Sequence, residues 1–130
     1  MEYNNHTVLA NSISLGCVTF GREIDKETSF VLMDHAWAMG VNLFDTASAY
    51  GNGASEEIVG EWFKHNLSAR DTVVIATKIL PPYDPASIRT SVEQCLKRLQ
   101  VETIDILYLH RWDEKLAGHA IWEALFHLIM

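Results

Sequence analysis

Residues 72–78 read Thr-Val-Val-Ile-Ala-Thr-Lys, an apolar run that is rich in β-branched residues and ends on a lysine. Such a run is typical of a strand that is buried on both faces, and we expect the strand over residues 72–77. Shorter apolar segments at residues 12–15 (or 12–18), 41–44 and 104–109 are similar. A helix-like stretch follows each of the four segments, which predicts repeated βα units and a parallel sheet.

The expected helices carry start signals and apolar residues at helical spacing. Asp25 predicts the N-cap of a helix that ends at Gly40, and Asp84-Pro85 predicts the cap and first residue of another helix. Ser55 opens a helix between these two. The positions expected to face the core are Phe30, Met33 and Trp37; Ile58, Val59, Trp62 and Phe63; Ile88, Val92, Cys95, Leu96 and Leu99; and Ile121, Trp122, Leu125, Leu128 and Ile129.

The distance between strand ends indicates the size of the repeating unit. Gly16, Asp45, Lys78 and His110 close the four strands at intervals of 29, 33 and 32 residues. About thirty residues is the length of one βα unit. Four units fill the 130 residues, which we treat as a single domain, 1–130. A closed (β/α)8 barrel needs about twice that length, so the spacing allows half of a barrel or an open four-stranded α/β sheet.

Composition excludes several classes of protein. With 10 Lys+Arg against 17 Asp+Glu, the net charge of −7 argues against a nucleic-acid or anionic-membrane partner. No apolar run approaches the ~18 residues of a membrane span. The first six residues, Met-Glu-Tyr-Asn-Asn-His, do not resemble a signal peptide. We therefore expect an acidic, globular, cytoplasmic protein.

Cysteine and histidine usage indicates neither a disulfide framework nor a metal site. Cys17 and Cys95 are too few for a framework, and we expect two reduced core thiols. The histidines apart from His110 show no metal-ligand spacing: His6, His35, His65, His119 and His127.

Three of the predicted strands end in residues with distinctive chemistry: Asp45, Lys78 and His110. Taken singly, each is more readily a surface or capping residue. In a parallel α/β fold, however, the carboxyl ends of all strands face the same side, so these side chains should converge there. Tyr50 lies five residues past Asp45, close enough for its loop to fold over the same side. The sequence Gly51-Asn52-Gly53 that follows is a turn signal and not a phosphate-binding motif.

Together these four residue types suit proton transfer. A phenol is a weak acid near neutral pH, and a lysine cation beside Tyr50 would stabilise the phenolate and make the phenol a better donor. Asp45 would hold Lys78 charged and in place. His110 would orient a carbonyl oxygen through a hydrogen bond. The set predicts reduction of a carbonyl group, with the hydride delivered by a cofactor because no side chain supplies one.

A set of motifs runs in order over nearly the whole chain: Leu15-Gly16, Phe20-Gly21, Asp45-Thr46-Ala47-Ser48-Ala49-Tyr50-Gly51, Ser55-Glu56 with Gly60, Ala76-Thr77-Lys78, Ser91-Val92-Glu93, Leu96-Lys97-Arg98-Leu99, Ile104-Asp105, Tyr108-Leu109-His110 and Asp113. In these motifs the sequence resembles the aldo-keto reductase family. The resemblance implies a (β/α)8 TIM barrel, here truncated to about its first four βα units. It also implies NADP(H)-dependent reduction of aldehydes and ketones to alcohols.

The resemblance assigns roles by position. It implies that Tyr50 is the general acid and base, that Lys78 assists it, and that Asp45 anchors Lys78 beside the nicotinamide. His110 would orient the substrate.

The resemblance also implies contacts with the cofactor and the substrate. The backbone at Thr19 and Phe20 would touch the cofactor, and Trp112 would form a wall of the substrate pocket. Family members continue for about as long again, and the resemblance implies that their second half supplies most of the remaining cofactor contacts.

The sequence is compatible with two functions of different classes, an enzyme and a non-enzymatic module. The first is an NADP-dependent carbonyl reductase that gains its missing half from outside, for example by self-association of half-barrels. The second is a catalytically inactive half-barrel that acts as an interaction or regulatory module. A partial chain without a function of its own is a third alternative. In each case the edges of the first and fourth strands are unpaired, and we expect them to drive self-association.

Overall fold

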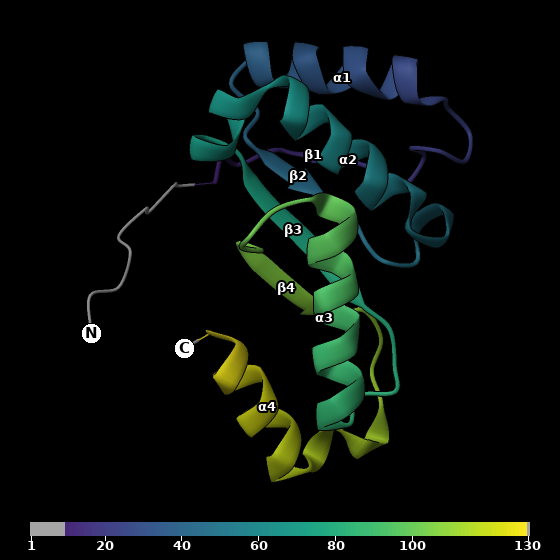
Figure 1. The fold of residues 1–130 in the computed structure, drawn as a ribbon, viewed down its shortest axis with the longest axis vertical. Coiled ribbons are helices and arrows are strands. Elements are labelled where there is room, and N and C mark those ends of the chain that lie inside the picture. Colours follow the sequence, from purple (N-terminus) through teal and green to yellow (C-terminus); the bar gives the residue numbers. More distant parts are fainter. Residues whose placement is uncertain (1–9, 130) are drawn as a thin grey trace.

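The computed structural model describes residues 10–129, so the first six residues and His6 lie outside the described part. Within it, one parallel sheet has its strands in chain order, β1-β2-β3-β4 (Figure 1). The strands are β1 Ser14–Gly16, β2 Leu43–Asp45, β3 Val74–Ile79 and β4 Ile106–Leu109. The predicted parallel sheet of βα units is therefore confirmed.

A helix follows each strand, as predicted (Figure 1). The α-helices are α1 Lys26–Ala38, α2 Ala54–His65, α3 Pro85–Leu99 and α4 His119–Ile129. Three short 3-10 helices stand in the connections, at η1 Tyr50–Gly53, η2 Leu67–Asp71 and η3 Glu114–Ala117. None of the helices in residues 10–129 is long and apolar enough to cross a membrane.

Both predicted N-caps are confirmed. The Asp25 side chain accepts a hydrogen bond from the Thr28 N–H at 2.8 Å, and the Asp84 side chain accepts one from the Ser87 N–H at 3.1 Å. Each carboxylate satisfies a backbone donor that has no partner within its helix. Pro85 is the first residue of α3, where its missing N–H leaves no hydrogen bond unmade.

The strand boundaries differ from the prediction, since all four strands start two residues later than expected. β1 has only three residues and starts at Ser14, because Ser14 is the first residue in register with Leu43 of β2. β3 continues to Ile79, because Lys78 and Ile79 pair with Tyr108 and Leu109 of β4. Lys78 therefore lies inside β3 and Asp45 is the last residue of β2, so the prediction that each of them follows its strand is wrong.

The two faces of the sheet have different surroundings. Side chains alternate between the faces of a strand, so Phe44, Ile75 and Ile79 share the face that packs against the helices. All three are fully buried. Ser14 and Tyr108 lie on the opposite face, where both are exposed. In a closed barrel this opposite face is the interior.

The larger core cluster is built around Trp62 of α2, which has no exposed area. Its ring lies 5.6 Å from that of Trp37, 5.3 Å from Phe44 and 5.2 Å from Phe63, measured between centroids. Its indole N–H donates to Asp34 Oδ1 at 2.7 Å. The sequence-based assignment of Trp37 and Trp62 to the core is confirmed.

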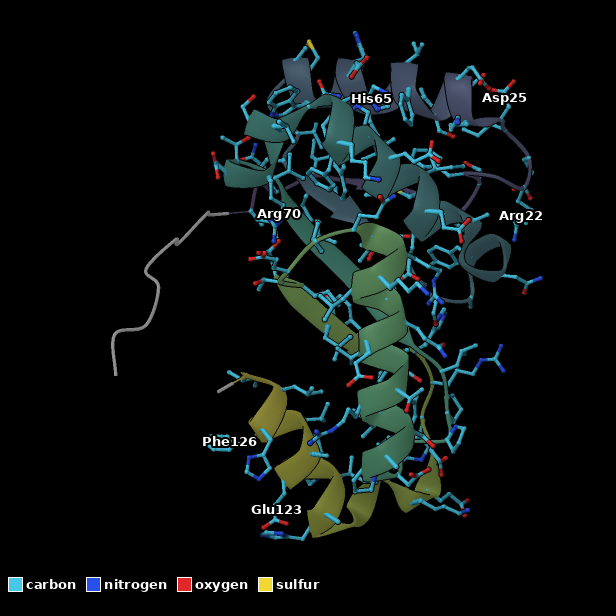
Figure 2. All side chains as sticks on the ribbon, in the orientation of Figure 1. Arg22, Asp25, His65, Arg70, Glu123 and Phe126 are labelled. Atoms are coloured by element: carbon cyan, nitrogen blue, oxygen red, sulfur yellow. The ribbon has the colours of Figure 1, made fainter. Side chains whose placement is uncertain are left out.

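The apolar face predicted for the last helix is only partly buried. Ile121 is buried and Leu125 half-buried, but Trp122 is 59% and Ile129 78% exposed, so their assignment to the core is wrong. The same holds for Leu128, which is exposed. α4 packs against α3, and side chains such as Phe126 point away from that contact (Figure 2). Nothing in the described residues covers that side of α4.

Candidate active site

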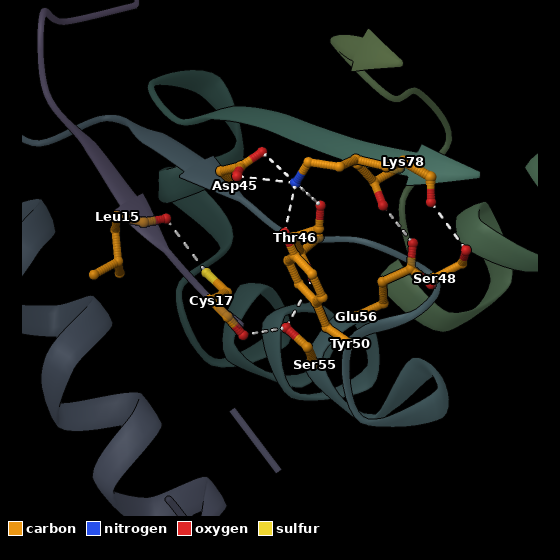
Figure 3. A network of polar contacts seen from close by, with 10 residues as sticks. Leu15, Cys17, Asp45, Thr46, Ser48, Tyr50, Ser55, Glu56 and Lys78 are labelled. Atoms are coloured by element: carbon orange, nitrogen blue, oxygen red, sulfur yellow. Dashed lines mark hydrogen bonds and ion pairs between the residues drawn. The ribbon is translucent and has the colours of Figure 1, made fainter. Parts of the chain in front are cut away.

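The ammonium group of Lys78 is the centre of a polar cluster on the open face of the sheet (Figure 3). Its Nζ donates to Asp45 Oδ1 at 2.8 Å and Oδ2 at 2.9 Å, and to the Thr46 carbonyl oxygen at 2.8 Å. It also contacts the Tyr50 hydroxyl at 3.2 Å and lies 4.7 Å from the centroid of the Tyr50 ring. Asp45, Tyr50 and Lys78, which the sequence predicts to converge, are thus in direct contact.

The surroundings of Lys78 keep it charged at neutral pH. Burial disfavours the ammonium form, but the hydrogen bonds and charge interactions with Asp45 and Tyr50 outweigh it. The net effect raises the pKa of Lys78 above its ordinary value. The phenol oxygen of Tyr50 therefore faces a permanent cation.

The loop between β2 and α2 carries Tyr50 over the strand ends. Gly51, Asn52 and Gly53 have φ values of 57°, 54° and 95°, which confirms the predicted turn. Ser48 fastens the loop to β3, since its backbone N–H and its hydroxyl both donate to the Lys78 carbonyl oxygen, at 3.0 and 2.9 Å. The loop and the lysine strand are therefore held together by backbone as well as side-chain contacts.

His110 completes the group from the end of β4. Its ring meets the Tyr50 ring edge-on, with centroids 5.9 Å apart and an interplanar angle of 87°. Its Nδ1 atom is buried and has no hydrogen-bond partner within residues 10–129. Burial, followed by the positive charges of Lys78 and Arg111, lowers the pKa of His110. The imidazole is therefore neutral at physiological pH and able to donate one hydrogen bond.

The side chains of Asp45, Lys78 and His110 border a hollow of about 410 Å³ on the open face, and Tyr50 is not among its lining residues. This is within the range of small-molecule sites. The lining residues are Ser14, Leu43, Asp45, Ala76, Lys78, Tyr108, Leu109 and His110. The hollow combines an ion pair and a neutral imidazole with apolar side chains, which suits a small organic ligand with one polar group.

The other predicted contact residues lie outside this lining. Phe20 as a whole residue is 1% exposed and belongs to the core, and its backbone N–H donates to the Cys17 carbonyl oxygen at 3.2 Å. The Thr19 carbonyl oxygen accepts from the N–H groups of Arg22, Glu23 and Ile24, at 3.2, 3.0 and 3.2 Å. Trp112 is 81% exposed in the segment after β4. Their roles in binding remain predictions.

Both cysteines are buried free thiols, as predicted. Burial raises the pKa of Cys17 well above its ordinary value and that of Cys95 to about 12. Both are therefore protonated and poor nucleophiles at neutral pH. Within the described part of the chain, no group of three or more His, Cys, Asp or Glu side chains could hold a metal ion.

One buried polar residue near these strands was not singled out as a functional candidate by the sequence analysis. Glu56, in the first turn of α2, has no exposed area. It precedes the core residues Val59 and Phe63 by three and seven positions, so it lies on the buried stripe of the helix. A carboxylate on an apolar stripe is the sequence signal that indicates such a residue.

Comparison with known proteins gives one consistent result. A family model described as the aldo/keto reductase family matches residues 12–130. "Uncharacterized oxidoreductase YrpG" of Bacillus subtilis is 36% identical over 129 residues, which cover 86% of this chain and 40% of that protein. Norsolorinic acid reductase B of Dothistroma septosporum is 34% identical over 146 residues, covering 95% and 37%.

A solved structure agrees with the sequence relatives. An aldo-keto reductase from Klebsiella pneumoniae, in complex with NADPH, superposes with a TM-score of 0.81 at 29% identity. The match covers 92% of this chain and 42% of that one. The chain thus spans about two fifths of the length of the proteins it matches. The four βα units are half of a (β/α)8 barrel, and the predicted fold class is confirmed.

Proposed function

The chain belongs to the aldo/keto reductase family, and on that premise we propose that it takes part in the NADP(H)-dependent reduction of an aldehyde or ketone to an alcohol. The observation that carries the proposal is the contact of Lys78 Nζ with both Asp45 and the Tyr50 hydroxyl. A phenol next to a held cation is a proton donor of useful strength near neutral pH. The NADPH-bound relative from Klebsiella pneumoniae supports the choice of cofactor.

In this mechanism the substrate carbonyl oxygen lies between Tyr50 and His110. The neutral imidazole of His110 donates a hydrogen bond that orients the oxygen. The Tyr50 hydroxyl then gives its proton to that oxygen, and Lys78 stabilises the phenolate that remains. Asp45 balances the charge of Lys78 and keeps its Nζ in place.

The residues present fit the reactive end of the cofactor. The hollow is bordered by the polar side chains of Asp45 and Lys78 and by the apolar side chains of Leu43 and Ala76, which suits a flat ring with an amide. The backbone of Thr19, which is half-buried in the loop after β1, would contact it. When bound, NADP(H) supplies the hydride that adds to the carbonyl carbon.

Two measurements test the proposal. NADPH binding is followed by tryptophan fluorescence, and NADPH oxidation is followed with benzaldehyde as the probe substrate. We expect saturable binding, and we expect Tyr50→Phe to lower turnover by a factor on the order of 10² to 10⁴ without loss of stability. Lys64→Met, at an exposed position of α2, is the control. It should alter neither turnover nor stability.

The opposite result identifies the alternative function. If the chain does not bind NADPH and Tyr50→Phe changes nothing measurable, the chain is a catalytically inactive half-barrel, and the alternatives are an interaction or regulatory module and a partial chain without a function of its own.

The β4 edge of the sheet supports a second proposal, self-association of the chain. A mainly apolar groove of about 910 Å³ runs along β4 between α3 and α4, with Ile106, Trp122 and Phe126 among its lining residues. We propose that a second copy covers this groove and pairs its β1 edge with β4. Light scattering of the 130-residue chain should show a dimer or larger species. A monodisperse monomer would overturn the proposal.

We also propose a cytoplasmic location. Cys17 and Cys95 are separate free thiols in the structure, which is typical of a reducing compartment. Fluorescent tagging and cell fractionation would test it.

A further inference from the structure

A second ion pair lies on the covered face of the sheet, opposite the candidate active site. The Glu56 side chain has no exposed area, and its two oxygens have separate partners. Oε1 accepts from the Thr77 hydroxyl at 2.6 Å, and Oε2 accepts from Arg98 Nε at 2.7 Å. A carboxylate without solvent is stable only with such partners. Glu56 therefore joins the start of α2 to β3 and to the end of α3.

Arg98 also packs against the loop that carries Tyr50. A Cβ atom on Gly53 would lie 2.7 Å from Arg98 Cδ and 2.9 Å from Nε, so the side chain passes directly over this glycine. Gly53 ends η1, the turn that Tyr50 begins. The side chain that neutralises Glu56 thus also limits the movement of the Tyr50 loop.

The neighbouring residue, Ser55, contacts the segments that follow β1 and β2. Its hydroxyl donates to the Cys17 carbonyl oxygen at 2.7 Å and lies 2.8 Å from the Thr46 hydroxyl (Figure 3). Thr46 follows Asp45 and Thr77 precedes Lys78 in the chain. The first turn of α2 therefore holds the residue next to Asp45 through Ser55 and the residue next to Lys78 through Glu56.

We propose that Glu56 is a positioning residue for the reaction. By fixing the first turn of α2 against β3, it keeps the Tyr50 hydroxyl within hydrogen-bond distance of Lys78 Nζ. The proposal rests on the proposed function of Tyr50 and Lys78. The 3.2 Å contact between them leaves little tolerance, since a shift of about 1 Å at a reacting group can lower turnover on the order of 10²-fold.

Two matched pairs of variants test this role. Thr77→Val removes the hydroxyl that Glu56 accepts from without changing any charge, and Thr77→Ser retains it. Glu56→Gln removes the buried charge, and Glu57→Gln makes the same change one residue along, where the side chain is exposed. Thr77→Val is the decisive variant, because the loss of the Glu56 charge would itself act on Lys78.

The first readout needs no turnover. NMR titration of the Lys78 side chain in the 130-residue chain measures its pKa, which the contacts with Asp45 and Tyr50 raise. We expect Thr77→Val and Glu56→Gln to bring this pKa back toward the ordinary lysine value. Thr77→Ser and Glu57→Gln should match the parent chain.

The second readout is steady-state reduction of benzaldehyde with NADPH. We expect Thr77→Val to lower kcat on the order of 10-fold or more and leave KM for NADPH unchanged, because the groups that contact the cofactor are intact. A purely structural role would lower the melting temperature and leave kcat per folded molecule unchanged.

Clear results would overturn the inference. A folded Thr77→Val protein with the Lys78 titration of the parent chain would show that Glu56 does not position the pair. If Glu56→Gln does not fold, Thr77→Val alone decides. If the parent chain does not reduce benzaldehyde, the proposed function is at fault, and the Lys78 titration still decides whether Glu56 holds the contact.

Discussion

Two ion pairs lie on opposite faces of the same sheet and differ in what surrounds them. In the Asp45–Lys78 pair the side chains are 32% and 16% exposed, and the pair borders a hollow beside Tyr50. In the Glu56–Arg98 pair the Arg98 side chain is 22% exposed, but the carboxylate has no exposed area and both its oxygens are used within the fold. The Asp45–Lys78 pair, here the open pair, has room for a ligand. The Glu56–Arg98 pair, here the sealed pair, joins α2, β3 and α3. The same chemical pairing thus faces a hollow on one side of the sheet and joins elements of the fold on the other.

The sealed pair should carry the larger share of stability. Glu56→Ala leaves Arg98 without its partner and opens a buried cavity, and we expect a loss of about 3–5 kcal/mol in the free energy of unfolding. Urea unfolding monitored by tryptophan fluorescence measures it. Glu57→Ala, on the exposed side of the same turn, should change stability by less than about 0.5 kcal/mol. Equal losses in the two variants would contradict the contrast between the faces.

The close approach of α2 and α3 around the sealed pair should be the next most sensitive feature. A Cβ on Gly60 would lie 2.5 Å from the Arg98 carbonyl oxygen and 2.6 Å from that of Leu99, so Gly60→Ala must push the helices apart. We expect a loss of about 1–3 kcal/mol by thermal unfolding. Gly118→Ala is the control, since its Cβ would meet only the Lys115 carbonyl oxygen, at 3.5 Å. A neutral Gly60→Ala would show that the helices yield freely.

Loss of the open pair should affect stability less. Lys78→Met leaves Asp45 partly exposed, so water can solvate the carboxylate, and we expect a change of about 1 kcal/mol or less in the free energy of unfolding. Turnover with NADPH and benzaldehyde should nevertheless fall by a factor on the order of 10² or more. Lys64→Met, at an exposed position of α2, should alter neither. If the Lys78→Met protein does not fold, the open pair contributes as much to stability as the sealed pair, and the contrast is wrong.

Much of the fold and the site could be predicted because the local signals, such as helix caps and apolar strand runs, agree with the parallel topology of the whole sheet. The caps at Asp25 and Asp84 depend on local backbone donors, and the strands of this parallel sheet read as apolar runs. The convergence of Asp45 and Lys78 follows from parallel topology alone.

Other features depend on neighbours that a local pattern does not contain. Lys78 lies inside β3 because β4 extends along it, which the apolar run ending at Thr77 does not reveal. Trp122 has the spacing of a core residue, yet it remains 59% exposed. The contact of Glu56 with Arg98 joins residues 42 positions apart and requires knowledge of how α2 and α3 pack.

The smallest expected effect is on the pH dependence of the free energy of unfolding, and it concerns His110 on the open face. Burial and the charges of Lys78 and Arg111 lower the pKa of His110 in the folded chain, so the unfolded chain binds a proton more readily. Stability should therefore fall as the pH drops through about 6.5, the ordinary value for histidine, and the loss is complete below the folded-state pKa. His110→Gln should flatten this part of the stability profile, measured by urea unfolding between about pH 8 and pH 5, while His127→Gln, at an exposed position of α4, should leave it unchanged. If stability still falls with pH in the His110→Gln variant, the titrating group lies elsewhere in the chain, and the imidazole beside Tyr50 does not cause the loss of stability in acid.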